Sequence, residues 1–495
     1  MSDNTWKPQD YASLAMVLGG GALFLYHLKQ QSSSASSSYS SLPSTIPSLP
    51  GIPDIPLINA LERAVQRDHL EFFFNHDEER KRGLTNHEPL TIIALAKLWN
   101  KDQTIPDDIL ESFHEDYKDF LNGFDAILVP PRSSLTPSLE LPTTLLRDEE
   151  FVIWALSKRG GGTEAIDELY PAITARLMAH GAEKTTNLIL NAVADEQGCL
   201  SALFHGFLLV CYGLPLIPPP GSSSSSSSPP PPSAPHLMVS CGLAVMIGRS
   251  GNNKGEGLFD HIDKKSNPAD ERPLEKRLDD LMTENEGDKL WEIVNGKKEV
   301  NVFPFGLVGA LGIVEGNEET LKIWKEISGK HLSGANINDN FEELAVLALN
   351  YYVATKGCFV ALHLVSAVFG LCRLQKHNKN NNNNNMYTNI AKALWTVTAL
   401  VKFVADRAQK SEGATVWDRA RGKNKPALEE LEILHPQDPT LAWESLSHQA
   451  VITLRSHTIK LVFACRSLSE MYPDNNEINH LTRVAAYYAV LHATG

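Results

Sequence analysis

Apolar residues recur at intervals of three or four positions along most of the chain, and no long stretch alternates between polar and apolar residues. This period places the apolar side chains on one face of an α-helix. No strand–helix–strand rhythm appears, so the pattern predicts an all-α fold. The predicted helices span residues 57–74, 88–99, 109–122, 147–156, 164–180, 200–216, 236–248, 341–374 with a break near Gly357, 389–408, 447–468 and 483–493.

Two apolar runs are long enough to raise the question of a membrane. Residues 11–28 form an uncharged run of eighteen, which is at the short end for a membrane-spanning helix. We expect an N-terminal membrane anchor there; a cleaved signal and a disordered targeting segment are the alternatives. Residues 200–216 are also strongly apolar, but Gly206, Gly213 and Pro215 interrupt them, so we expect a buried core helix.

Low-complexity segments mark the boundaries of the folded part. Residues 29–55 are rich in Ser and Pro and predict a disordered linker. The globular domain is expected over residues 56–495, with a Ser- and Pro-rich insertion at 217–235 and an Asn-rich insertion at 375–386. The sequence therefore predicts a large multi-helix domain tethered to a membrane.

The segment 447–468 carries two polar residues at unexpected places. It contains no Pro or Gly and predicts one long helix. His457 and Lys460 are three residues apart, so they project from the same helical face. Lys460 lies between Ile459 and Leu461. A lysine in such surroundings reaches to the surface, pairs with an acid or takes part in chemistry.

Other histidines also lie in or beside apolar segments, namely His69, His87, His205 and His363. A single buried histidine is usually a core residue whose ring nitrogens have hydrogen-bond partners. Five histidines on separate apolar segments favour a second interpretation. In this interpretation His87, His205, His363 and His457 share one metal ion, which satisfies their rings together.

The donor atoms limit the metals that fit. Nitrogen donors alone suit zinc, copper, iron or nickel, and an added oxygen ligand shifts the balance toward iron. If Lys460 is buried among its apolar neighbours, its pKa is lowered and its amine can be neutral. A neutral amine reacts with carbon dioxide to give a carbamate, which is a carboxylate-like ligand. Lys460 is therefore also a candidate metal ligand.

Charge and cysteine usage exclude other classes of protein. The 495 residues carry a formal net charge of −14 without a run of Lys or Arg, so nucleic acid is not an expected partner. The six cysteines form no C-x-x-C pair, and N-x-S/T sequons are absent. Both features favour free thiols in a reducing compartment, and hence a cytosolic globular domain. Walker, G-x-S-x-G and H-E-x-x-H motifs are also absent.

Short motifs around these histidines resemble those of the questin oxidase family. The matching pieces are "HLEFFFN", "NHEPLTIIAL", the apolar helix that holds His205, "ALHLVSAVF" and "SHTIKLV", in the family's order over roughly residues 57–470. By this matching, the family's polar positions are taken by His69, His87, His205, His363, His457 and Lys460.

The chain departs from the family pattern at three places. Leu90 and Thr91 stand in the turn where the family has a further histidine. Ser201 stands at a second histidine position, and Ser456 stands where the family has an aspartate before the last histidine. A set of metal ligands that used those positions would be incomplete here.

The resemblance implies an oxidoreductase that uses oxygen for a Baeyer–Villiger-type or ring-cleaving oxidation of a small aromatic, polyketide-like substrate. It implies non-haem iron at the histidines and NADPH as a cosubstrate, although the sequence shows no NADPH site. His69 is then the candidate catalytic residue facing the substrate. The alternative is a non-catalytic, membrane-tethered helical protein of the same fold that binds a partner or a hydrophobic ligand, and the missing aspartate and histidines favour it.

Overall fold

The computed structural model describes residues 54–68, 71–72, 84–85, 87–99, 104–122, 147–193, 198–199, 204–218, 232–250, 277, 288–290, 292, 318–331, 341–354, 357, 359–377, 384–410 and 442–491. The expected anchor, 11–28, lies outside these residues, as does the expected linker up to residue 53. Within the described residues, every helix is too short or too polar to cross a bilayer.

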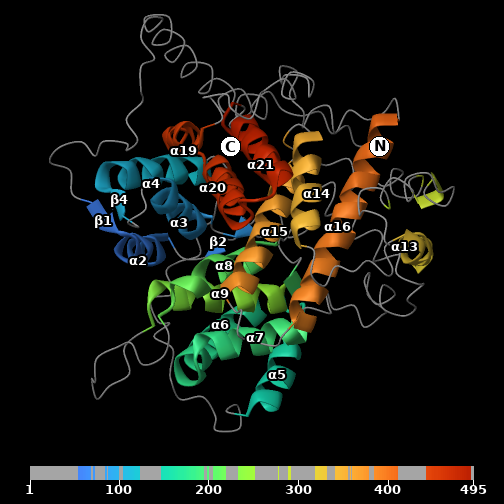
Figure 1. Cartoon of the computed structure of the whole chain (residues 1–495). Coiled ribbons are helices and arrows are strands. Elements are labelled where there is room, and N and C mark those ends of the chain that lie inside the picture. The colour runs from blue at the N-terminus through green and yellow to red at the C-terminus, as the bar shows by residue number, and fades with distance from the viewer. Residues whose placement is uncertain are drawn as a thin grey trace, which may run out of the picture.

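The described part is predominantly helical, so the prediction of an all-α fold is confirmed (Figure 1). The helices are α2 (Leu57–Asp68), α3 (Glu88–Trp99), α4 (Asp107–Asn122), α5 (Asp148–Leu156), α6 (Gly162–His180), α7 (Ala182–Val193), α8 (His205–Gly213), α9 (Ala234–Gly248), α13 (Glu318–His331), α14 (Phe341–Ala354), α15 (Phe359–His377), α16 (Asn384–Lys410), α19 (Trp443–Ile452), α20 (Ser456–Met471) and α21 (Asn476–Leu491), with a 3₁₀ turn, η4 (Leu214–Leu216), after α8.

Two short antiparallel ladders join the first helices, and the sequence did not predict them. Strand β1 (Asp54–Pro56) pairs with β4 (Thr104–Pro106), and β2 (Glu71–Phe72) pairs with β3 (Leu84–Thr85). The helix predicted over 57–74 therefore ends at Asp68. Strands of two or three residues are too short for a period-two pattern to be visible in the sequence.

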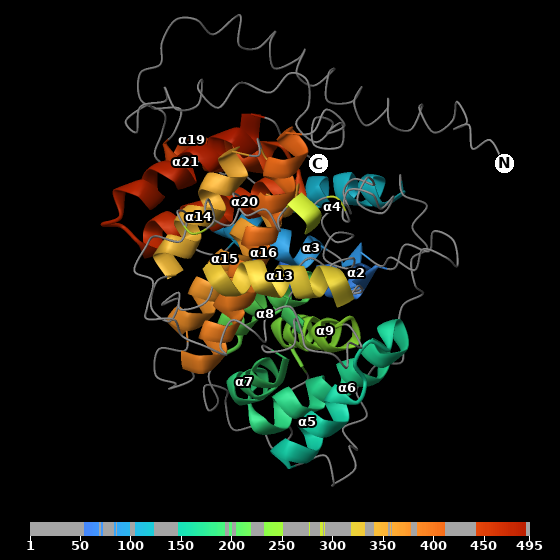
Figure 2. The same ribbon diagram turned by 90° about the vertical axis from the view of Figure 1, so that its right-hand side faces the viewer.

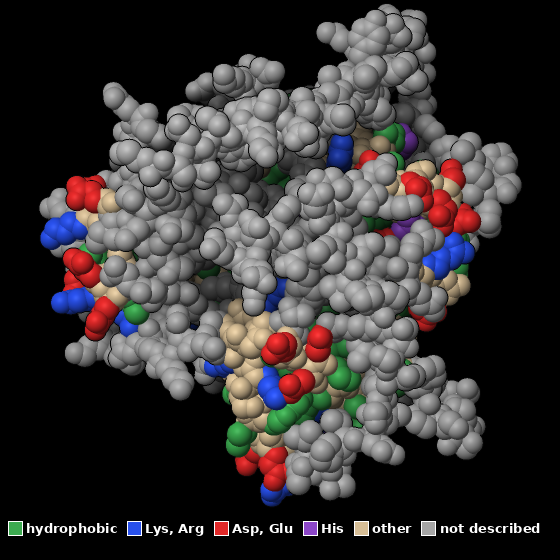
Figure 3. Space-filling model, turned by 180° about the vertical axis from the view of Figure 1, so that it is seen from behind, with side chains coloured by type: hydrophobic (Ala, Val, Ile, Leu, Met, Phe, Trp, Pro, Cys, Tyr) green, Lys and Arg blue, Asp and Glu red, His purple; other side chains and the backbone are tan. Residues whose placement is uncertain are grey.

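Four helices from distant parts of the chain meet at the centre of the molecule. Helix α20 packs against α3 and α15, and α8 packs against α15 and α9. Helices α5, α6 and α7 lie at one end of the molecule, and α19, α20 and α21 lie towards the other (Figures 1 and 2). On the face shown in Figure 3, acidic and basic side chains of the described residues intermingle.

Within the apolar run at 200–216, residues 205–213 form the buried helix α8, so a buried helix is confirmed there. Every residue of α8 is buried. Gly206 and Gly242 bring α8 into backbone contact with α9, because a Cβ on Gly242 would lie 2.5 Å from the Gly206 carbonyl oxygen. Gly206 directly follows His205, so this contact fixes the helix that carries the histidine.

The single helix predicted over 447–468 is wrong. Helix α19 ends at Ile452 and α20 begins at Ser456. Between them Leu454 has a left-handed backbone, with φ 53°. The Thr453 hydroxyl donates a hydrogen bond to the Ala450 carbonyl (2.7 Å) and accepts one from the Arg455 N–H (3.2 Å). A threonine side chain thus replaces the helical hydrogen bonds at the break.

Other predicted boundaries shift by a few residues. The break near Gly357 is confirmed, since α14 and α15 flank it and its φ is 81°. Helix α15 continues to His377 and α16 begins at Asn384, so the insertion predicted at 375–386 is shorter. The insertion predicted at 217–235 ends before α9 begins at Ala234.

The predicted free thiols are confirmed for the described cysteines. They are all buried, and they are Cys199, Cys211, Cys241, Cys372 and Cys465. Cys358 lies outside the described residues.

We expect Gly242→Ala to lower the free energy of unfolding by about 2 kcal/mol, because the added methyl group overpacks the contact between α8 and α9. Urea unfolding followed by circular dichroism measures the change. Cys241→Ala is the control, since it removes an atom from the neighbouring buried position. Equal stability of the Gly242→Ala variant and the wild type would contradict the close contact.

Candidate metal centre

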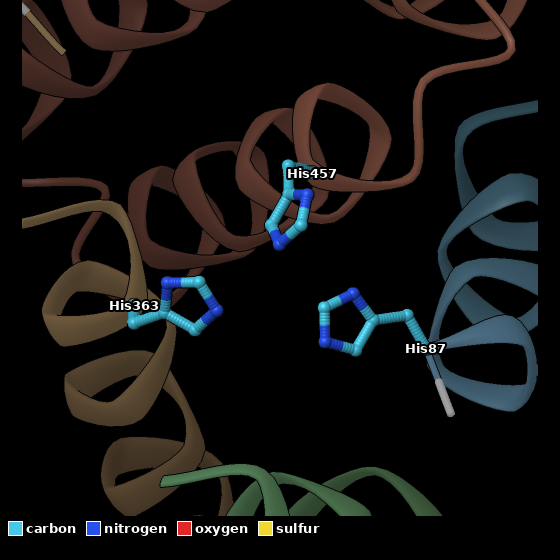
Figure 4. A group of neighbouring side chains, drawn as sticks. All are labelled: His87, His363 and His457. Carbon is cyan, nitrogen blue, oxygen red and sulfur yellow. The ribbon is translucent and has the colours of Figure 1, made fainter. Parts of the chain in front are cut away.

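Four of the predicted histidines lie together, each on a different central helix. His87 directly precedes α3, His205 is the first residue of α8 and His457 is the second residue of α20. His363 lies in the second turn of α15. All are buried, with between 1% and 9% of their surface exposed. Figure 4 shows the rings of His87, His363 and His457 around a common centre.

The imidazoles form one continuous cluster. The ring centroids of His87 and His205 are 4.3 Å apart, and those of His87 and His457 are 4.7 Å apart. His363 has its ring centroid 4.9 Å from that of His205 and 5.2 Å from that of His457. The predicted convergence of these four side chains is therefore confirmed.

Three of the histidines can hold a metal ion. One nitrogen from each of His87, His363 and His457 lies within 4.8 Å of the other two. His205 Nε2 is 2.5 Å from His87 Nε2 and 3.2 Å from His363 Nε2. Two nitrogen ligands of one ion lie about 3 Å apart when the metal–nitrogen bonds are about 2.1 Å long. The spacing of 2.5 Å is shorter than this, and a shift of roughly half an ångström would bring both rings onto one ion.

Lys460 belongs to the same cluster and is buried, so it does not reach the surface, which was one of the alternatives that the sequence left open. Only 3% of its surface is exposed, and its charge lowers the pKa of both His87 and His457. Burial lowers the pKa of Lys460 itself to about 7, and no described carboxylate offsets this effect. A substantial fraction of Lys460 is therefore a neutral amine at neutral pH.

The surroundings keep the imidazoles of His87 and His457 neutral. Burial lowers the pKa of His87 and His457 well below the usual value, and the charges of Lys460 and the neighbouring histidines add to this effect. A neutral imidazole has a free lone pair on one ring nitrogen, which is the form that binds a metal. His87 and His457 are therefore in the protonation state that a metal ligand requires.

Three of the helices that carry the cluster also share a layer of aromatic side chains. Tyr212 on α8, Phe369 on α15 and Phe463 on α20 form a second layer, with ring centroids between 5.3 and 5.6 Å apart. Each lies about two turns after the histidine of its own helix. All three helices therefore lead from the histidine layer towards the aromatic layer.

Helix α3 shares this direction. Near its C-terminal end, burial lowers the pKa of Lys97. The charge of Arg373 on α15 lowers this pKa further, and the charge of Glu470 on α20 raises it. These three residues lie near the C-terminal ends of their helices. The N-terminal ends of all four helices therefore gather at the histidines.

The start of α3 is fixed by α4, which sequence reasoning missed. The backbone N–H of His87 donates a hydrogen bond to the Tyr117 hydroxyl (3.0 Å). Beside it the fully buried carboxylate of Glu88 contacts Nδ1 of His114. An acidic residue directly after His87 indicated a buried polar contact at this place. Its partner on α4, His114, could not be identified without the fold.

The structure does not place every predicted position in this site. His69, the candidate catalytic residue, lies outside the described residues, as does Ser201. Leu90 is fully buried in the hydrophobic core one turn after His87. The Thr91 hydroxyl donates a hydrogen bond to the His87 carbonyl (2.9 Å), and Ser456 is the first residue of α20.

The chain matches no protein-family model and no curated protein. The resemblance to questin oxidases therefore rests on the short motifs around the histidines. The described fold and site define the chain as an all-α protein with a buried cluster of four histidines and one lysine.

We expect the chelator-treated protein to lose stability as the pH falls below about 6.5, the pKa of histidine in an unfolded chain. Because the pKa of His457 is lowered in the folded state, the unfolded chain binds more protons in this window. Each unit by which the pKa is lowered is worth about 1.4 kcal/mol. The measurement is urea unfolding at pH 7.5 and pH 5.

The variant His457→Gln removes this titrating group, so its unfolding free energy should fall less between the two pH values. His448→Gln is the control, because His448 is exposed on α19. A pH dependence of His457→Gln equal to that of the control would contradict the lowered pKa.

Proposed function

We propose that the chain is a metal-dependent oxidoreductase whose ion lies among His87, His205, His363 and His457. The observation that carries the proposal is the burial of four imidazoles and one amine from four helices in a single cluster. Burial disfavours the charged forms of these basic groups and lowers the pKa of His87, His457 and Lys460. Such clusters of perturbed groups mark functional sites more often than ordinary packing.

The donor set supports a transition metal. Imidazole nitrogens suit zinc, copper, iron and nickel, and the resemblance to questin oxidases favours non-haem iron among them. A divalent ion held only by neutral nitrogens would keep both of its charges inside an apolar core, so an anionic ligand is expected. A carbamate formed from the neutral Lys460 amine and carbon dioxide would supply a negative charge at this place.

When bound, such an ion would supply oxygen activation. The protein's own residues would hold it: the imidazoles as neutral ligands, and the Tyr117 hydroxyl and the Glu88–His114 contact as supports for the start of α3. The buried position excludes bulk water, which strengthens every electrostatic interaction in the site.

The substrate class and cosubstrate follow from the resemblance to questin oxidases alone. We propose a small aromatic, polyketide-like substrate. A Baeyer–Villiger-type reaction inserts one oxygen atom into the substrate and reduces the other to water with two electrons and a proton from NADPH and a further proton from solvent. A ring-cleaving dioxygenation places both atoms in the product and needs no NADPH. The ratio of NADPH consumed to oxygen consumed distinguishes the two reactions.

Membrane anchoring through residues 11–28, a cytosolic location and a catalytic role for His69 belong to the same proposal. A non-catalytic protein of the same fold is the alternative, and Ser456 at the family's aspartate position favours it. Oxygen consumption that depends on the bound metal would exclude the alternative.

We expect the purified protein to carry about one transition-metal ion per chain, as measured by inductively coupled plasma mass spectrometry. His363→Ala and His457→Ala should each lose most of this metal, because loss of one ligand weakens binding and the remaining donors cannot replace it. His448→Ala, at an exposed position on α19, is the control and should keep its metal. Metal-free wild-type protein that also fails to bind added iron, zinc or cobalt would contradict the proposal.

For Lys460→Met we expect the metal content to fall while helicity persists. Methionine keeps the length and apolar character of the side chain but removes the nitrogen. Since a buried amine without an acidic partner is itself unfavourable, the stability of the metal-free variant should equal or exceed that of the wild type. An unchanged ratio of metal to protein would exclude Lys460 as a ligand and leave the histidines as the whole set.

A further inference from the structure

Two residues with unfavourable backbone conformations lie just before helices of the metal cluster. Among the described residues, Phe204 (φ 67°) and Leu454 (φ 53°) are the non-glycine residues with positive φ. Phe204 lies one residue before His205, and Leu454 lies three residues before His457. Both strained residues thus occur where a candidate metal ligand begins its helix.

Neither residue is one that favours this conformation. The left-handed region brings Cβ close to the following carbonyl oxygen, and a bulky residue there is an outlier. Glycine or asparagine fits without this cost, and glycine does so before α15, where Gly357 has φ 81°. A strained residue persists only where its surroundings hold it, and such residues gather at functional sites.

Packing of the side chains of Phe204 and Leu454 against the core stabilises these strained conformations. Phe204 is 2% exposed and is part of the hydrophobic core, and Leu454 packs against the same core. The backbone of Phe204 leads directly into α8, with His205 as its first residue. At the other site Leu454 separates α19 from α20. The Thr453 hydroxyl forms hydrogen bonds with Ala450 before Leu454 and with Arg455 after it.

We propose that Phe204 and Leu454 are positioning residues for the metal centre. Their left-handed backbones set the direction in which α8 and α20 begin, and this direction aims His205 and His457 at the shared ion. The inference rests on the proposed metal site. It adds that the geometry of two ligands is determined by the strained residue before each helix.

The test compares residues at position 454 by their tolerance of the left-handed region. Leu454→Ile keeps the volume and apolar character but adds a β-branch, which is unfavourable there. Leu454→Asn loses apolar contact but adopts the conformation readily. The probe is Co²⁺, titrated into the chelator-treated full-length protein and followed by its visible absorption, with the thermal unfolding midpoint measured alongside.

We expect Leu454→Ile to weaken Co²⁺ binding roughly tenfold and to change the absorption spectrum. Leu454→Asn should keep its affinity within about threefold while its unfolding midpoint falls. A residue that only packs would give the opposite order, with Asn affected more than Ile in both measurements, and that result would overturn the inference. Leu446→Ile, at a buried helical position of α19, controls for the exchange itself.

A second pair covers the case in which the Ile variant does not fold. Leu454→Ala and Leu454→Gly lose nearly the same packing but differ in their tolerance of positive φ. We expect the Gly variant to bind Co²⁺ roughly fivefold more tightly than the Ala variant. Equal affinities would overturn the inference while leaving the metal site intact, whereas absence of Co²⁺ binding in the wild type would overturn both.

Discussion

The structure depends on the burial of four imidazoles and one amine in a single cluster. Because no described carboxylate offsets the burial of Lys460, its charge is suppressed by burial alone. The arrangement of the four central helices acts in the same direction. Their N-terminal ends, which carry partial positive charge, gather around the histidines. This charge disfavours imidazolium, and it would favour an anionic ligand on a bound ion. The opposite end of the bundle carries Lys97 and Arg373, where the helix dipoles favour cations.

Most of the helices and the residues of the candidate site could be predicted from the sequence, but the contacts between helices could not. Polar residues are easily recognised inside apolar helical segments. His205, His363 and Lys460 were identified in this way. The segments that carry them are long and strongly periodic, so their helical state was also clear. Periodicity alone, however, says nothing about which helices are neighbours. The convergence of the cluster rested on chemical reasoning about buried basic groups and on the resemblance to questin oxidases.

What the sequence concealed has identifiable physical causes. The break between α19 and α20 lies at Leu454. Leucine has a high helix propensity, so the local sequence does not predict a break there. It arises from tertiary packing that overrides propensity. The contact between Glu88 and His114 joins residues from two helices, and only the fold brings them together. The two ladders are too short for a pattern, and the contact of Gly206 with Gly242 depends on the crossing of α8 and α9.

The distribution of the histidines along the chain makes a bound ion a cross-link. His87 and His205 are 118 residues apart, and His205 and His363 are 158 residues apart. An ion that joins them closes loops as long as those of the longest disulfides, and such closure restricts the unfolded chain strongly. It also sets an order of events during synthesis. Because His457 follows the other three histidines in the chain, a site with all four could form only after α20 has been synthesised. An ion bound before that point would rest on an incomplete set of ligands.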